Sequence, residues 1–217
     1  MVGVQFTQIG GESLDLATGG NLDKTMSGPD EDGNFATEML VWNGNGYDTY
    51  GWSGTAGTDA LEDESLNYKW LNLDAELAEG DFPLASGAWV NAGEAGNITI
   101  SGEVVSGTTS TIQLVAGFNM VANPFPETTP IATFGVLNAE MEGPDEDGNF
   151  ATELLVWNGN GYDTYGWSGT AGTDALEDPS LDYKWLNLDA ELASGNVDIG
   201  HAVWINAKTA GTITFTK

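Results

Sequence analysis

The residues with the clearest chemistry in the sequence form a short acidic loop that occurs twice. Oxygen-bearing side chains stand at positions 1, 3, 5 and 9 of each copy, and a glycine lies inside the turn. Calcium takes about six to eight hard oxygen ligands, which alternate residues of a tight loop can wrap around one ion. We therefore predict a Ca²⁺ site in each copy. Its ligands would be Asp30, Asp32, Asn34 and Glu38 in the first copy, and Asp145, Asp147, Asn149 and Glu153 in the second.

The spacing of this loop differs from that of an EF-hand. An EF-hand loop carries its glycine at about position 6 and its last carboxylate at about position 12, whereas Gly33 stands at position 4 and Glu38 at position 9. The alternative interpretation is a solvated Asp-Gly turn that leads into a strand. Both interpretations stay open on the sequence alone.

The sequence offers little for catalysis. It contains one histidine, His201, and the other copy of the repeat carries Ser86 at the same place. Cysteine and arginine are absent, so a thiol nucleophile is excluded. A glycosidase needs two carboxyl groups about 5–10 Å apart, and acids are so abundant here that no pair stands out. We therefore predict that the protein is not an enzyme.

Aromatic side chains suggest a second kind of site. Tryptophans and tyrosines flank a predicted hairpin in each copy, and sugar-binding proteins stack such rings on pyranoses. Aromatic residues on an alternating strand also serve as core or as cross-strand pairs. Glycan binding is therefore one of two interpretations of this set. The residues are Trp42, Tyr47, Tyr50 and Trp52, with their duplicates Trp157, Tyr162, Tyr165 and Trp167.

An internal repeat organises the chain. Gly28–Ala78 returns as Gly143–Ala193, 115 residues later, with three differences in 51 positions. The same offset extends to both sides without a gap. Such self-similarity indicates repeated structural units, and each unit is of ordinary domain size. The sequence predicts a β module over residues 1–102, a linker or strand over 103–115, and a second β module over 116–217.

Short segments of alternating polarity, separated by glycines, predict an all-β fold. Thr37–Trp42 and Tyr47–Trp52 flank the sequence Asn-Gly-Asn-Gly, which favours a β-hairpin because its turn needs positive φ. Val4–Gln8 alternates like a half-buried strand. We expect Gly87–Asn91 and Asn97–Ser101 to close the module as an antiparallel pair. Many short strands favour two tandem antiparallel β-sandwich domains, with a barrel-like arrangement as the alternative.

Charge excludes two classes of partner. The 33 acidic residues against five lysines give a formal net charge of −28. This charge repels phosphate groups, so neither nucleic acid nor an anionic membrane surface is an expected partner. The sequence also lacks a run of about 18 apolar residues, which a membrane-spanning helix would need. Such acidity suits a protein surrounded by salt or divalent cations that screen it.

Three motifs resemble those of a known class of proteins. Ile112–Phe125 (IQLVAGFNMVANPF) resembles the opening of repeated modules in large secreted bacterial surface proteins. Val41–Tyr47 (VWNGNGY) and Gly87–Val90 (GAWV) are similar to further strands of those modules. The resemblance covers nearly all of the second module and less of the first, whose opening Gly3–Phe6 departs from the pattern. It implies export to the cell surface and a β-sandwich-like fold, and it names no activity.

The two modules differ at their ends. The strand-like segment Thr111–Val115 precedes the second module, and the first module has no counterpart. The second module ends at Lys217 without the continuation Glu103–Val105. If the linker strand pairs within the fold, each end has an incomplete edge, and exposed edges bind other strands. We therefore predict a structural subunit of an extracellular filament or surface layer, which pairs with itself as a head-to-tail homopolymer. A secreted carbohydrate-binding or adhesive surface protein with calcium-stabilised modules is the alternative.

Overall fold

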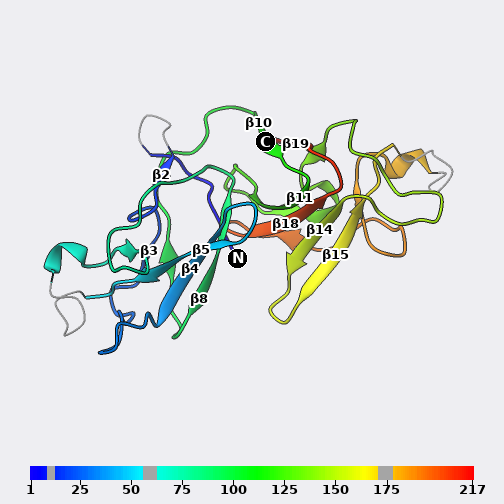
Figure 1. Cartoon of the computed structure of the whole chain (residues 1–217). Coiled ribbons are helices and arrows are strands. Elements are labelled where there is room, and N and C mark those ends of the chain that lie inside the picture. The colour runs from blue at the N-terminus through cyan, green and yellow to red at the C-terminus, as the bar shows by residue number, and fades with distance from the viewer. Residues whose placement is uncertain (9–12, 56–62, 171–177) are drawn as a thin grey trace. The chain divides into compact units, whose positions relative to one another are not determined.

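The computed structural model of the chain describes residues 1–8, 13–55, 63–170 and 178–217 (Figure 1). Its regular structure consists of antiparallel β-strands and short 3-10 turns, so the all-β prediction is confirmed. The chain divides into two compact units. The N-terminal unit is Val4–Val105 with Val2, and the C-terminal unit is Ser106–Lys217 with Met1 and Gly3.

A five-stranded sheet forms the centre of the N-terminal unit. Its strand order is β1-β8-β4-β5-β6, and the short pairs β2–β7 and β3–β9 accompany it. The 3-10 turn η1 (Glu64–Leu66) precedes β6. The strands are β1 (Val2–Gly3), β2 (Leu14–Asp15), β3 (Asn21–Leu22), β4 (Thr37–Trp42), β5 (Tyr47–Trp52), β6 (Trp70–Leu71), β7 (Asp81–Phe82), β8 (Gly87–Ala92) and β9 (Ile98–Thr99).

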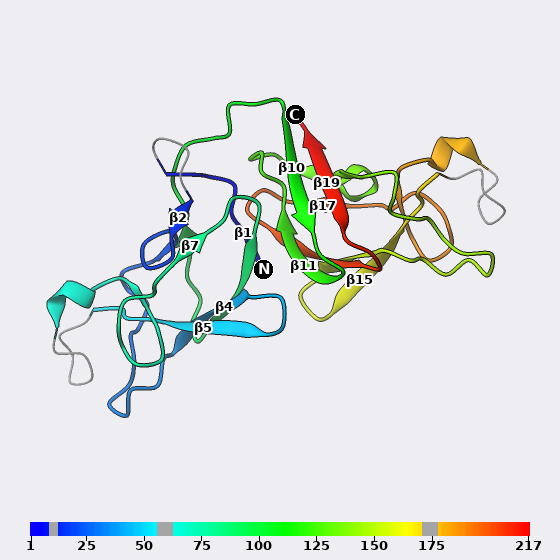
Figure 2. The same ribbon diagram turned by 45° about the horizontal axis from the view of Figure 1, so that its top comes forward.

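The C-terminal unit has a sheet of the same order, β11-β18-β14-β15-β16, with the short pair β12–β17. A third sheet has the order β10-β19-β13, and Figure 2 shows β10 beside β19. The turns are η2 (Ile131–Thr133) and η3 (Pro179–Leu181). The strands are β10 (Thr109–Leu114), β11 (Gly117–Ala122), β12 (Thr129–Pro130), β13 (Val136–Leu137), β14 (Glu153–Trp157), β15 (Tyr162–Trp167), β16 (Trp185–Leu186), β17 (Asn196–Val197), β18 (Ala202–Ala207) and β19 (Gly211–Thr216).

The predicted hairpin is confirmed with its predicted bounds. β4 pairs with β5 in antiparallel register, with Trp42 opposite Tyr47. The side-chain oxygen of Asn43 accepts the backbone N–H groups of Asn45 and Gly46 at 3.1 and 3.0 Å. Gly44 has φ +97, a conformation that glycine adopts without strain. The turn is therefore closed by local chemistry that the sequence contains.

Buried tryptophans hold the sheet against the rest of each unit. The rings of Trp52 and Trp70 are fully buried and meet edge to face at 5.3 Å. Trp167 and Trp185 occupy the same places in the C-terminal unit, with centroids 5.1 Å apart. The indole N–H of Trp185 donates to the carbonyl oxygen of Phe134 at 2.8 Å. Each ring removes a large apolar area from water, so these pairs anchor the core.

One predicted strand pair is wrong. Gly87–Asn91 and Asn97–Ser101 do not pair with each other, because β8 lies between β1 and β4 while β9 pairs with β3. Both edges of β8 are occupied within the large sheet, so the chain crosses to another sheet before it forms β9.

The beginning of the N-terminal unit also departs from the repeat. The strand β1 has two residues, where β11 has six. The N–H of Val4 donates to the carbonyl of Ser86 at 2.9 Å, whereas the 115-residue offset would place Val4 opposite Val90. In the C-terminal unit, Asn119 lies opposite Ile205. Its side chain donates to the carbonyls at 115 and 117 at 2.8 and 2.9 Å, which fixes the turn into β11. The side chain of Val4 cannot donate such hydrogen bonds, so the N-terminal unit does not keep the pairing register that Asn119 fixes in the C-terminal unit.

Candidate functional site

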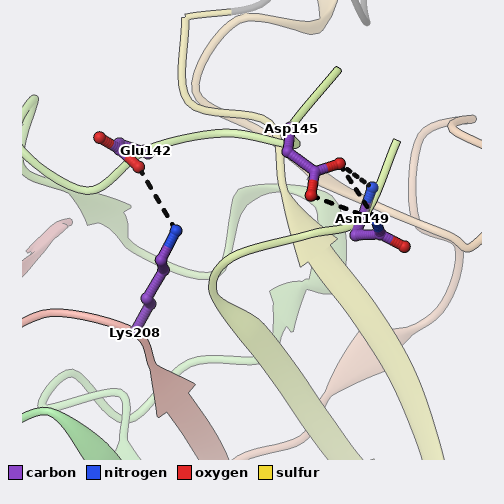
Figure 3. A network of polar contacts seen from close by, with 4 residues as sticks. All are labelled: Glu142, Asp145, Asn149 and Lys208. Atoms are coloured by element: carbon purple, nitrogen blue, oxygen red, sulfur yellow. Dashed lines mark hydrogen bonds and ion pairs between the residues drawn. The ribbon is translucent and has the colours of Figure 1, made fainter. Parts of the chain in front are cut away.

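The acidic loop of the C-terminal unit folds around the carboxylate of Asp145 (Figure 3). This carboxylate accepts the backbone N–H of Asn149 at 2.8 Å and of Asp147 at 3.0 Å. The side-chain amide of Asn149 donates to both carboxylate oxygens at 3.2 and 3.1 Å. The hydrogen bonds from Asn149 hold the pKa of Asp145 below its ordinary value, and the positive charge of Lys208 lowers it further. Ionised Asp145 therefore stabilises its own loop.

The loop of the N-terminal unit has the same geometry. Asp30 accepts the backbone N–H groups of Asn34 at 2.8 Å and of Asp32 at 3.0 Å. The side-chain amide of Asn34 donates to its two oxygens at 3.2 and 3.0 Å. The bond from that amide is the main reason why the pKa of Asp30 lies below its ordinary value. The turn is thus built from hydrogen bonds that need no ion.

The structure brings some of the predicted calcium ligands together and separates others. Asp30 meets Asn34, and Asp32 takes part through its backbone N–H. Glu38 lies in β4, and its duplicate Glu153 accepts the side-chain amide of Asn206 at 3.2 Å. Among the residues described, no group of three or more acidic or histidine side chains is arranged to hold a metal. Calcium binding in these loops stays a prediction.

A shallow cleft lies beside the second acidic loop. It has a volume of about 590 Å³ and is lined in part by Asp145, Phe150 and Lys208. Lys208 forms an ion pair with Glu142 at 3.7 Å, as Figure 3 shows. Both side chains are largely exposed, so the pair contributes little to stability.

The predicted aromatic set divides between the two faces of the hairpin. Trp52 and Trp167 belong to the core, and burial raises the pKa of Tyr50 and Tyr165. The remaining four rings lie on the outer face. They form the edge-to-face pairs Trp42–Tyr47 and Trp157–Tyr162, each with centroids 5.3 Å apart.

The outer aromatic face of the C-terminal unit continues into two further rings, the exposed Phe118 and the buried Trp204. Trp157 and Tyr162 are both 38% exposed. The indole N–H of Trp204 in β18 donates to the hydroxyl of Tyr162 at 3.2 Å. Phe118 in β11 meets Trp204 edge to face at 5.8 Å. The alternation of side chains along β18 is the sequence signal that could have pointed to Trp204. Its contact with Tyr162 could not be predicted, because it depends on which strands lie side by side in the sheet.

Two strand edges form the remaining candidate surface. β10 pairs with β19 alone, and β9 pairs with β3 alone, within the part of the chain that the structure describes. Residues 95–102 and 104–126, which contain these two strands, carry no charged side chain. Uncharged uncovered edges are sites for pairing with a further strand. Of the predicted linker 103–115, residues 109–114 form β10, which belongs to the C-terminal unit.

The one histidine of the sequence is His201. It is exposed just before β18, and its backbone N–H donates to the carbonyl of Asp198 at 3.1 Å. No helix in the described ranges is long and apolar enough to cross a membrane. Comparisons of the chain with protein-family models, with curated proteins and with solved structures found no match.

Proposed function

We propose that this chain is a structural subunit of an extracellular filament or surface layer, and that its copies join head to tail through β-edge contacts. In this proposal the two units are homologous tandem β-sandwich modules. Each presents the same hairpin, β4–β5 in one and β14–β15 in the other. The repeated modules would act as beads of one fibre.

The observation that carries the proposal is the pair of uncovered strand edges. β9 in the N-terminal unit and β10 in the C-terminal unit each have one strand partner among the described residues. The two edges differ in sequence and belong to different units, so contact between them would be heterologous. Heterologous contacts that do not close into a ring produce open filaments.

The net charge of −28 bears on how such a subunit would assemble. Charges of one sign keep copies apart at low ionic strength, and salt shortens the range of this repulsion. The proposal therefore places assembly at moderate salt or in the presence of divalent cations. Calcium bound in the acidic loops would reduce the repulsion further.

The test is the mass of the native protein over a range of concentrations and salt. Light scattering is expected to show growth beyond the monomer as protein and salt increase, and negative-stain microscopy is expected to show filaments or sheets. A single monomeric species at high concentration, with and without calcium, would refute the filament.

Calcium can be tested independently of assembly. Ligand that binds the folded state alone raises the melting temperature by mass action. The wild-type protein is expected to melt higher in calcium than in an equal concentration of magnesium. A variant with Asp30→Ala, Asp32→Ala, Asp145→Ala and Asp147→Ala should lose this difference. Equal melting temperatures of the wild type in the two ions would contradict the calcium sites.

A second candidate function is carbohydrate binding on the outer aromatic face. The observation that favours it is the exposed ring pair Trp157–Tyr162, which the N-terminal unit repeats as Trp42–Tyr47. Titration with neutral oligosaccharides is expected to change tryptophan fluorescence in the wild type. The double variant Trp42→Ala/Trp157→Ala should lose the response, whereas Leu73→Ala/Leu188→Ala, which alters exposed leucines outside both hairpins, should keep it. An unchanged response in the tryptophan variant would exclude this face.

A further inference from the structure

We infer that the joint between copies is a continuous β-sheet, in which the uncovered edge of β9 in one copy pairs with the outer edge of β10 in the next. The inference rests on the proposed head-to-tail assembly and names the two surfaces that meet. It requires no strand to leave its own fold, because β10 keeps its contact with β19 along one edge and uses the other.

The C-terminal unit shows what covers an edge of this kind. All six residues of β10 pair with β19, with Thr111 opposite Thr214 and Ile112 opposite Ile213. The hydroxyls of Thr111 and Thr214 lie 3.0 Å apart. By the repeat offset, β9 stands where β19 stands, and β3 stands where β13 stands. The edge of β9 that faces away from β3 is therefore the one that β10 covers in the other unit.

β9 has kept the residues that face β10 in the duplicate. Residues 79–102 match 194–217 at only 8 of 24 positions. Three of these matches lie on the strand itself or just before it, where Gly96, Ile98 and Thr99 correspond to the residues opposite Leu114, Ile112 and Thr111. The chemistry of a receiving edge is thus present in the N-terminal unit.

The apolar side of β9 is less well covered than that of its duplicate. Ile213 is fully buried and Phe215 is 3% exposed. Their counterparts Ile98 and Ile100 are only half-buried. A strand added beside β9 would cover these two side chains, and burial of apolar area favours association.

Charge points to a second copy as the occupant. Edge strands of soluble proteins commonly carry charged residues that prevent pairing, yet neither edge has one within residues 95–102 or 104–126. On a chain with a net charge of −28 these are surfaces where two copies can approach without opposing carboxylates. The two segments also alternate in the same way: Ile112 and Leu114 of β10 face the core, as do Ile98 of β9 and Ile100 just after it.

The fold also determines the direction of the pair. The open edge of β9 corresponds to the edge of β19 that β10 occupies. In the proposed joint this edge lies against the outer edge of β10, and the apolar faces of both strands are on the same side of the sheet. The incoming unit must then be turned by half a revolution about an axis perpendicular to the sheet, which reverses the direction of its strands. β10 is antiparallel to β19, so β9 of the next copy runs parallel to β10.

The test uses charged variants of each edge. Thr99→Glu/Ser101→Glu blocks β9 and leaves β10 intact, and Thr111→Glu/Gln113→Glu does the reverse. The controls Asn45→Glu/Ser65→Glu and Asn160→Glu/Ser180→Glu add the same charge at exposed positions in the same two units. Sedimentation is measured at a salt and protein concentration at which the wild type assembles, after circular dichroism has shown that each variant is folded.

The expected result is loss of all species beyond the monomer for each edge variant, while both controls assemble like the wild type. An equimolar mixture of the two edge variants should stop at dimers, because it contains one compatible pair of edges. Amide exchange at residues 97–101 and 109–114 should slow when the wild type assembles. Edge variants that assemble normally, or a mixture that stays monomeric, would overturn the inference and leave the filament itself standing. A monomeric wild type would instead refute the proposed function.

Discussion

The N-terminal and C-terminal units share one hairpin and differ in what surrounds it. In the C-terminal unit, the rings of Phe134 and Phe215 meet edge to face at 5.1 Å and are almost fully buried. Gly19 and Ile100 hold these places in the N-terminal unit. They line a narrow apolar crevice of about 10 Å³, which is about the smallest space that admits a water molecule. The comparison shows that near-identical hairpins can be packed by quite different partners.

Volume is redistributed between the two cores. Phe82 in β7 is buried where the C-terminal unit has Val197 in β17. This ring of the N-terminal unit replaces part of the core volume that Phe134 and Phe215 fill in the C-terminal unit. The two units also differ at one strand edge, because β10 pairs along β19. We therefore expect the C-terminal unit to be the more stable of the two.

The largest expected effect comes from removing the ring that only one unit contains. Phe134→Ala should destabilise the C-terminal unit by about 3–5 kcal/mol, because a buried ring is lost and a cavity remains. The half-buried Ile100→Ala in the N-terminal unit should cost about 1–2 kcal/mol. Chemical denaturation followed by near-ultraviolet circular dichroism measures both. Equal losses would show that the two cores are packed alike.

A second prediction concerns the part that the units share. A methyl group added at Gly51 would overlap the ring of Phe35, and one at Gly166 would overlap Phe150. Gly51→Ala and Gly166→Ala should each cost about 1–3 kcal/mol through overpacking. Since this local structure is duplicated, the two losses should agree. Thermal melting of the single variants tests this, and clearly unequal losses would mean that the hairpin is packed differently in the two units.

A third prediction exploits a backbone conformation filled by different residues. Ala85 has φ +64, and the corresponding Gly200 has φ +79. Gly200→Ala should cost about 1–2 kcal/mol, because a side chain is unfavourable in this region. In Ala85→Gly the relief of backbone strain is offset by the loss of a buried methyl group. We therefore expect the free energy of unfolding to change by close to zero. The denaturation midpoints of the two variants provide the measurement, and a neutral Gly200→Ala would contradict the conformational argument.

The smallest expected effect is electrostatic. Lys208 lowers the pKa of Asp145, and the N-terminal unit has Gly93 at its place, so Asp30 has no such neighbour. Lys208→Ala should raise the pKa of Asp145 and leave that of Asp30 unchanged. Carboxyl carbon shifts in an NMR titration report both values. A shift of equal size at Asp30 would show that general charge, and not proximity, is the cause.

The same aspartates determine how the loops respond to acid. Their folded pKa values lie below the ordinary 3.8, so the carboxylates contribute stability that is fully present above that value. The contribution is lost as pH falls through the lower folded pKa. Melting temperatures of Asp145→Asn and wild type should therefore converge at low pH and separate above it. A constant difference at all pH values would indicate that charge on Asp145 is not involved.

Local features of this protein could be predicted from its sequence because their causes are local. The hairpin from Thr37 to Trp52 was predicted with its bounds, since Asn43 and Gly44 supply the turn within four residues of chain. The sequence of the loop Asp30–Asn34 left two interpretations open, a calcium site and a solvated Asp-Gly turn. In the structure the backbone N–H and the side-chain amide of Asn34 donate to the carboxylate of Asp30, and calcium binding stays a prediction.

The sequence by itself determined the strand-rich composition, the duplicated hairpins and the alternation that divides each hairpin strand between two faces. Tertiary structure alone decided that β9 pairs with β3 rather than with β8, and that β10 joins the C-terminal unit. The physical reason is that a turn is closed by neighbours along the chain, whereas a strand edge gains its hydrogen bonds from whichever segment the packed core brings beside it. Which edges are left uncovered is therefore a property of the folded molecule.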